Sequence, residues 1–103
     1  MSSTLLPEKD PRESVVVAFD FSDEATALVG TPQVSCVVFA GNTTDATPGA
    51  MVSGSATPSG TQVLQRIQGG KSGNSYGLSC VATNSNGDTL VRAAVLPVLT
   101  QPN

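Results

Sequence analysis

Short runs of alternating apolar residues, each cut off by Gly, Pro, Asn or Asp, constrain the fold of this chain more than any other feature. A period of two predicts β-strands that bury one face, and no run is long enough for a helix of three turns. The sequence therefore predicts an all-β protein. The five clear runs are 14–21 (SVVVAFDF), 33–40 (QVSCVVFA), 62–68 (QVLQRIQ), 75–83 (SYGLSCVAT) and 88–98 (DTLVRAAVLPV).

The parity of each run assigns its buried face. Alternate residues of the first run share one side: Val15, Val17, Phe19 and Phe21. In the fourth run the corresponding set is Tyr76, Leu78, Cys80 and Ala82. A chain with only four aromatic residues needs them all inside. We therefore expect the three phenylalanines, Phe39 included, and the tyrosine in the core.

The segments between the runs carry turn and loop signals. Residues 41–61 are rich in Gly, Pro, Ser and Thr and are interpreted as mostly loop, with one apolar patch at 50–52 as a possible edge strand. Residues 84–87 (NSNG) predict a tight turn between the last two strands. Pro97 cannot donate to a strand ladder, so the last strand ends or bulges there, or lies at a sheet edge.

Five clear strands and two weaker ones predict a small immunoglobulin-like β-sandwich of about seven strands with extended terminal arms. We divide the chain into an N-terminal arm (1–12), a sandwich domain (13–98) and a C-terminal tail (99–103). Prolines at 7, 11 and 102 favour extended backbone in both arms.

Composition excludes several classes of function. The 103 residues contain no His, which removes the usual general base and the commonest zinc ligand, so we expect neither an enzyme nor a metal or cofactor site. A net charge of −3 argues against binding nucleic acid. No apolar run is long enough to cross a membrane, and the first ten residues lack the pattern of a signal peptide.

Charge is distributed unevenly along the chain. Eight of its thirteen charged residues lie between positions 8 and 24, so the long remainder is almost neutral. Because the centres of protein interfaces are depleted in charge, this deficit favours a subunit of an assembly. A neutral domain covered by Ser, Thr, Asn and Gln is the alternative.

Cys36 and Cys80 have the parity of core residues, so they could face each other as the disulfide between strands B and F of an immunoglobulin domain does. The Trp that packs on such a bridge is missing, and Tyr76 stands four residues before Cys80 instead of two. We favour buried free thiols, since an unpaired cysteine packs as a small hydrophobic side chain.

Several short motifs, taken in order, resemble a family of small tailed-bacteriophage proteins, the fiber-tail adaptors or head-to-tail joining proteins. The resemblance covers residues 8–98. Phe21, Phe39 and Asp88 depart from the usual pattern, which has Trp or Tyr, Trp, and often Arg at these places. The motifs are Lys9-Asp10-Pro11-x-Glu13, Asp20-Phe21-Ser22, Leu28-x-Gly30, Gly69-Gly70-x-x-Gly73-x-x-Tyr76 and a hairpin with Gly87.

This resemblance implies a non-enzymatic virion protein, assembled in the cytoplasm of a bacterial host. Its implied partners are portal or connector, tail or fiber proteins and further copies of itself in a ring. We expect the N-terminal arm to contact them through Leu5, Leu6, Pro7, Pro11 and Arg12. A capsid decoration protein is one alternative, and a secreted immunoglobulin-like adhesion or carbohydrate-binding module is another.

Overall fold

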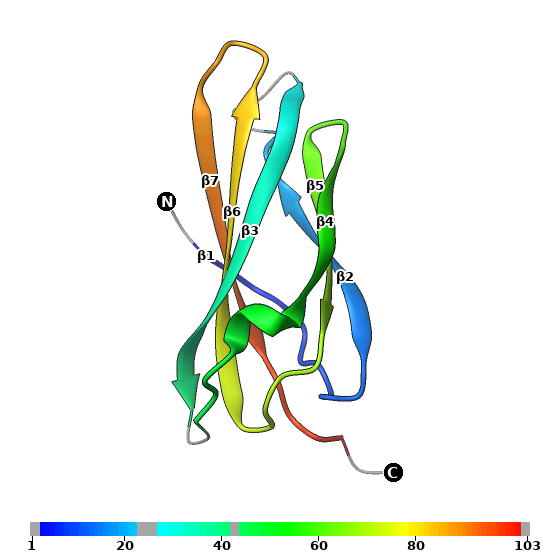
Figure 1. Ribbon diagram of the computed structural model, residues 1–103, viewed down its shortest axis with the longest axis vertical. Helices are drawn as coiled ribbons and strands as arrows, with labels where there is room; N and C mark the ends of the chain where they lie inside the picture. Colours follow the sequence, from blue (N-terminus) through cyan, green and yellow to red (C-terminus); the bar gives the residue numbers. More distant parts are fainter. Residues whose placement is uncertain (1–2, 23–26, 42–43, 102–103) are drawn as a thin grey trace.

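The computed structural model describes residues 3–22, 27–41 and 44–101, which form an elongated body of 45 × 22 × 21 Å (Figure 1). Most of these residues lie in strands, as the alternating apolar pattern predicts. The elements are β1 (Ser3–Leu5), β2 (Ser14–Asp20), β3 (Leu28–Gly41), the 3₁₀ helix η1 (Pro48–Met51), β4 (Val52–Ser59), β5 (Gln62–Gln68), β6 (Asn74–Asn84) and β7 (Thr89–Pro97).

Two sheets make the sandwich. One has the order β1-β7-β6-β3 and the other the order β2-β5-β4. All pairs are antiparallel except β1 with β7, which run parallel. If β2 to β7 are compared with immunoglobulin strands B to G, the sheets have the orders B-E-D and C-F-G of that fold. The predicted all-β sandwich is confirmed.

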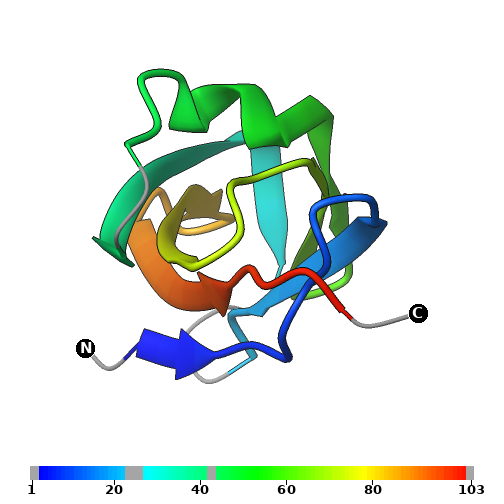
Figure 2. The same cartoon turned by 90° about the horizontal axis from the view of Figure 1, so that it is seen from below.

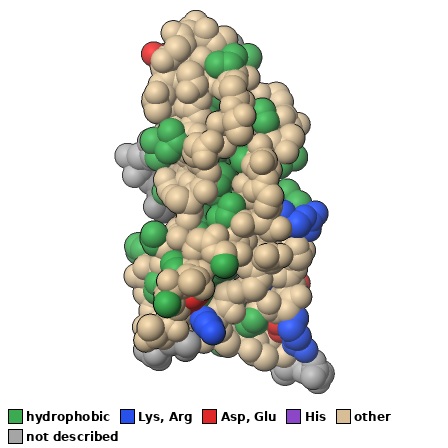
Figure 3. All heavy atoms as spheres, viewed as in Figure 1, with side chains coloured by type: hydrophobic (Ala, Val, Ile, Leu, Met, Phe, Trp, Pro, Cys, Tyr) green, Lys and Arg blue, Asp and Glu red, His purple; other side chains and the backbone are tan. Residues whose placement is uncertain are grey.

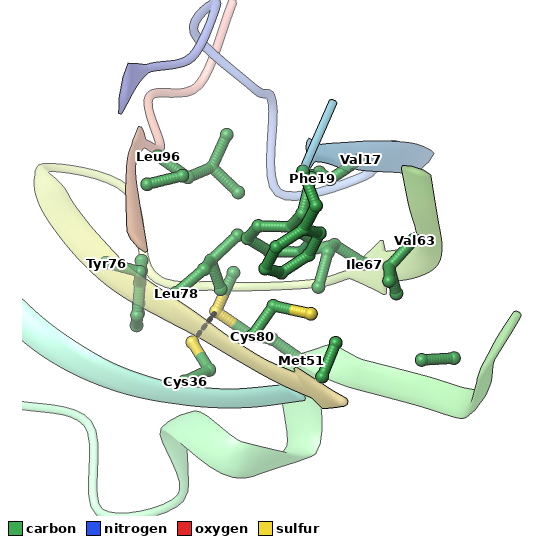
Figure 4. Close-up of a cluster of buried hydrophobic side chains, with 14 of the residues drawn as sticks. Val17, Phe19, Cys36, Met51, Val63, Ile67, Tyr76, Leu78, Cys80 and Leu96 are labelled. Carbon is green, nitrogen blue, oxygen red and sulfur yellow. Dashed lines mark hydrogen bonds between the residues drawn. The ribbon is translucent and has the colours of Figure 1, made fainter. Parts of the chain in front are cut away.

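The core lies between the inward faces that the parity of the strands predicts. Val17 and Phe19 of β2 point into the interior, opposite Tyr76, Leu78 and Cys80 of β6 (Figure 4). Phe21, directly after β2, is buried as well. Leu96 from β7 and Ile67 from β5 join them. Each of these side chains is at most 6% exposed, so the hydrophobic effect fixes which face of each strand turns inward.

The segment 41–61 contains more regular structure than we predicted. Its described part forms η1 at Pro48–Met51, followed by the full strand β4 at Val52–Ser59. The apolar patch at 50–52 therefore spans the end of a helix and the start of a strand. Because β4 lies at a sheet edge, only Ala56 among its residues is fully buried, and the strand shows little alternation.

Helix η1 lies across the side of the sandwich between β3 and β4, as the end-on view shows (Figure 2). Its last residue, Met51, is 3% exposed and places its sulfur 3.9 Å from the Sγ of Cys36 (Figure 4). The single turn thereby fills a gap that neither sheet covers.

Strand β3 begins at Leu28, five residues earlier than we predicted. Its ladder with β6 is interrupted between Val29 and Gln33, where Gly30 has a φ of 72°. An edge strand tolerates such a bulge, and it tolerates Pro32, because a proline lacks the backbone donor that pairing needs. Because glycine and proline usually mark a turn, the sequence did not predict the first part of β3, although its backbone continues through both residues.

The expectation that Phe39 is a core residue is wrong. Its side chain is 66% exposed on β3, whereas Phe19, Phe21 and Tyr76 are at most 3% exposed. A bulge between Val38 and Ala40 leaves Phe39 without a partner residue in the β3–β6 ladder. The interior of so small a sandwich is filled by the other aromatic residues.

Tyr76 ends in a buried polar group at one pole of the sandwich. Its hydroxyl donates to Asp45 Oδ2 at 2.8 Å and accepts from the backbone N–H of Lys71 at 2.8 Å. Burial raises the pKa of Tyr76, and the hydrogen bond from its hydroxyl lowers the pKa of Asp45. This network ties the segment after β3 to the turn between β5 and β6.

The predicted turn between β6 and β7 is present. Gly87 has a φ of 88°, and its N–H donates to the carbonyl of Asn84. The side-chain Oδ1 of Asn84 accepts from the N–H groups of Asn86 and Asp88. Among the residues that the structure describes, only glycines adopt a positive φ.

Cys36 and Cys80 do not face each other across the sandwich, as a bridge between strands B and F would require. They lie on β3 and β6, which are neighbours in one sheet, and Cys36 is paired with Leu78. Both thiols are free and buried. Burial raises the pKa of each to about 11, so neither is a thiolate at neutral pH.

Candidate functional site

The motif at residues 9–13 (KDPRE) builds a tight turn, here called the Asp10 turn. The Asp10 carboxylate accepts hydrogen bonds from the backbone N–H and the Nε of Arg12, both at 2.8 Å, and forms an ion pair with Nη2 of Arg12 at 2.6 Å. It also accepts from the N–H of Gln101. These donors hold the pKa of Asp10 well below its ordinary value.

Glu13 completes this turn in a reciprocal way. Its Oε1 accepts the N–H of Asp10 at 2.8 Å, and its own N–H donates to the carbonyl of Asp10. The hydrogen bonds of Asp10 and Glu13 therefore stabilise the turn, which is the physical reason for the two acidic residues of the motif. Only side chains with acceptor oxygens can fill both positions.

Lys9 fastens the Asp10 turn to the sandwich. The residue is 2% exposed, and its Nζ donates to the carbonyls of Asp10 at 2.9 Å and Gly69 at 2.7 Å. Its backbone N–H donates to Pro97, and its carbonyl accepts from Leu99. Burial lowers the pKa of Lys9. One residue thus joins the N-terminal segment, the β5–β6 turn and the end of β7.

The described part of the predicted N-terminal arm lies along the sandwich. Strand β1 pairs in parallel with β7, with Leu5 beside Val95, and the N–H of Leu6 donates to Val95. Leu5 is 75% exposed, whereas Leu6 packs partly against the core. Residues 1, 2, 102 and 103, which belong to the predicted arm and tail, lie outside the described residues.

Of the five residues we expected to contact a partner, two line a groove on the surface, Leu6 and Pro7. Leu5 projects into solvent nearby. Pro11 and Arg12 instead belong to the Asp10 turn, where the guanidinium of Arg12 is engaged by Asp10. The charge of Arg12 therefore orders the turn.

The groove, here called the β2 groove, runs between the N-terminal segment and β2 and has a volume of about 490 Å³. Its walls are mainly aliphatic, and Glu8 and Glu13 at its rim are exposed carboxylates. Val16 is 51% exposed, so the groove leaves apolar surface open to solvent. The lining residues are Leu6, Pro7, Glu8, Lys9, Glu13, Val15, Val16, Val17, Ala18 and Leu96.

Strand β2 gives this groove a second property. It is an end strand of its sheet, and within residues 3–22, 27–41 and 44–101 it pairs only with β5, so among these residues one edge of its backbone has no partner strand. An edge strand presents N–H and C=O groups that can pair with an added chain. Apolar walls beside such an edge are the combination by which extended peptides add to sheets.

The sequence did not reveal the β2 groove. Alternation within 14–21 places Val16 and Ala18 on the outer face, but it gives no sign that the N-terminal segment lies beside them. The exposed apolar character of Val16 was the available signal, since outward positions of a solvated strand are usually polar.

Other kinds of site find little support in the described residues. Within residues 3–22, 27–41 and 44–101, no three Cys, Asp or Glu side chains are placed to hold a metal ion. In the same part of the chain, no helix is long and apolar enough to cross a membrane.

A β-sandwich that presents an apolar groove beside an unpaired strand edge has the architecture of a protein-binding module. Comparison with protein families narrows this class. The model of the family described as podophage GP4 fiber-tail adaptor protein gp77 matches residues 9–97. The chain belongs to this family, which confirms the resemblance seen in its motifs. A search of curated protein sequences with this chain found no match.

Proposed function

We propose that this protein is a non-enzymatic adaptor of the podophage virion that joins tail and fiber proteins, and that the β2 groove receives an extended segment of one of them. Its family supports the adaptor role. The observation that carries the binding mode is the free edge of β2 beside aliphatic walls.

The groove indicates the chemistry of its occupant. Aliphatic side chains of an added strand would fill the space between Leu6 and Val16, while its backbone would pair with β2. Exposed Glu8 and Glu13 at the rim favour a Lys or Arg beside that apolar segment. An extended segment with alternating aliphatic residues and a flanking basic residue meets both requirements.

Particles assembled with Val16→Asp as the only copy of the adaptor test this proposal. A carboxylate in the apolar groove loses its hydration when a partner strand covers it, so we expect the variant to fold but to be missing from purified particles. Leu99→Asp is the matched control, because Leu99 is 45% exposed and lies outside the groove. Normal incorporation of Val16→Asp would contradict the binding mode.

The position of the wild-type protein in imaged particles tests the adaptor role separately. We expect its density between the tail and the fibers. Density spread over the capsid shell would support the decoration protein considered above and would overturn the adaptor role.

A further inference from the structure

The most exposed large apolar side chains of the described residues lie at the two edges of one sheet. Leu5 on β1 is 75% exposed, and Phe39 and Val37 on β3 are 66% and 58% exposed. Strands β1 and β3 are the end strands of the four-stranded sheet, so its apolar exposure is concentrated at opposite edges.

These two edges carry no charge. Residues 1–7 and 28–41 contain no Asp, Glu, Lys or Arg. The one charged residue within the strands of this sheet is Arg92, whose guanidinium lies 5.1 Å from the centroid of the Phe21 ring. In Figure 3 hydrophobic side chains are scattered over the face, including the side of β7 and β3, while Lys and Arg lie toward the opposite side and the lower end. Proteins commonly protect edge strands with charged residues, and neither end strand of this sheet carries one, although η1 lies beside β3.

The two edges are also matched in register. Leu5 is paired with Val95, Val95 with Gly77, and Gly77 with Val37, so one row crosses all four strands. Val37 and Phe39 lean over Gly77, where an added Cβ would lie 3.5 Å from Val37 Cγ2 and 3.8 Å from Phe39 Cβ. The pairings also make β1 and β3 parallel, so a second copy can continue the row without reversing its direction.

We infer that the β3 edge of one copy packs against the β1 edge of a second copy, with Leu5 of one on Val37 and Phe39 of the other. Copies that each carry a net charge of −3 repel, so a contact between them is favoured where charge is absent. A different protein is usually selected through complementary charges, which these edges lack. Because the contact joins two different surfaces, it repeats from copy to copy and generates a ring when the rotation closes.

Cysteine cross-linking tests this contact. Leu5→Cys and Phe39→Cys are prepared separately, mixed, and treated with a short bis-maleimide, both in solution and in assembled particles. Both positions are exposed, and the native thiols are at most 5% exposed, so the wild type measures the background. We expect a covalent dimer in the mixture, a ladder from the double variant, and nothing above background from either single variant.

Two results would overturn the inference. Equal cross-linking of a single variant with itself would show a self-facing contact, and a mixture that yields no product within particles would show that the edges do not meet. In the second case, normal amounts of adaptor in those particles would leave the adaptor role intact. Sedimentation gives a second measurement: Phe39→Asp is expected to reduce association, whereas Leu99→Asp, outside both edges, is not.

Discussion

Replacing Lys9 with Met tests whether the buried ammonium stabilises the fold. Methionine keeps most of the aliphatic stem but removes the donor to Asp10 and Gly69. The carbonyl of Asp10 retains the N–H of Glu13, so the partly buried carbonyl of Gly69 is the group that loses its partner. Two hydrogen bonds from a charged donor contribute about 3–6 kcal/mol. Removing the cost of burying the ammonium offsets several kcal/mol of that loss.

We therefore expect Lys9→Met to lower the free energy of unfolding by about 1–2 kcal/mol. In a domain of this size, each kcal/mol lost lowers the melting temperature by about 4–8 °C. Urea denaturation at neutral pH measures the change, and Lys71→Met, at an exposed lysine, is the control. A Lys9→Met protein as stable as the wild type, or more stable, would show that desolvation of the ammonium outweighs its hydrogen bonds.

The pH dependence of stability gives an independent check on Lys9. Burial lowers its pKa below the ordinary 10.5, so just below that pH the unfolded chain binds more protons than the folded chain. Stability then rises with pH through this window. The rise belongs to the wild type and is expected to be absent from Lys9→Met; parallel curves for the two proteins would refute the assignment.

Three further predictions follow from buried polar groups. Tyr76→Phe removes the donor to Asp45 and is expected to lower the free energy of unfolding by about 1–2 kcal/mol; an unchanged urea midpoint would count against it. Cys36 and Cys80 are expected to resist a thiol reagent at neutral pH and to titrate as two thiols after denaturation without reductant, fewer than two indicating a disulfide. Because the folded pKa of Asp10 is lowered, its carboxylate stabilises the fold above pH 3.8 and loses this effect as pH falls toward the folded pKa. The Asp10→Asn variant is expected to be less stable than the wild type at neutral pH. Its stability is also expected to fall less than that of the wild type when the pH is lowered, and thermal melts at several pH values measure both effects.

The expected contacts of the adaptor separate into two surfaces. The β2 groove lies beside the edge of the three-stranded sheet, whereas the exposed residues Leu5 and Phe39 lie at the edges of the other sheet. Binding to another virion protein and contact between copies can therefore be altered by separate substitutions. Many weak contacts made together in a closed ring stabilise an assembly more than any one contact could.

The positions of β2, β5, β6 and β7 and the buried faces of β2 and β6 followed from the sequence alone, because alternation along a run depends only on local spacing. The run 62–68 coincides with β5 at Gln62–Gln68, and Tyr76, Leu78 and Cys80 are buried as their parity requires. The motif at residues 9–13 likewise depends on side chains a few positions apart, which is why it could be recognised as a unit.

Tertiary structure decided which strands lie side by side and which edges stay open. Phe39 lies in an apolar run, yet its side chain is exposed on the outer face of β3 beside Val37, because the small interior is filled by the other aromatic residues. The N-terminal segment becomes one wall of the β2 groove because buried Lys9 reaches Gly69, sixty residues away along the chain. Such contacts depend on how distant segments share one limited interior, and alternation within a single run carries no information about that competition.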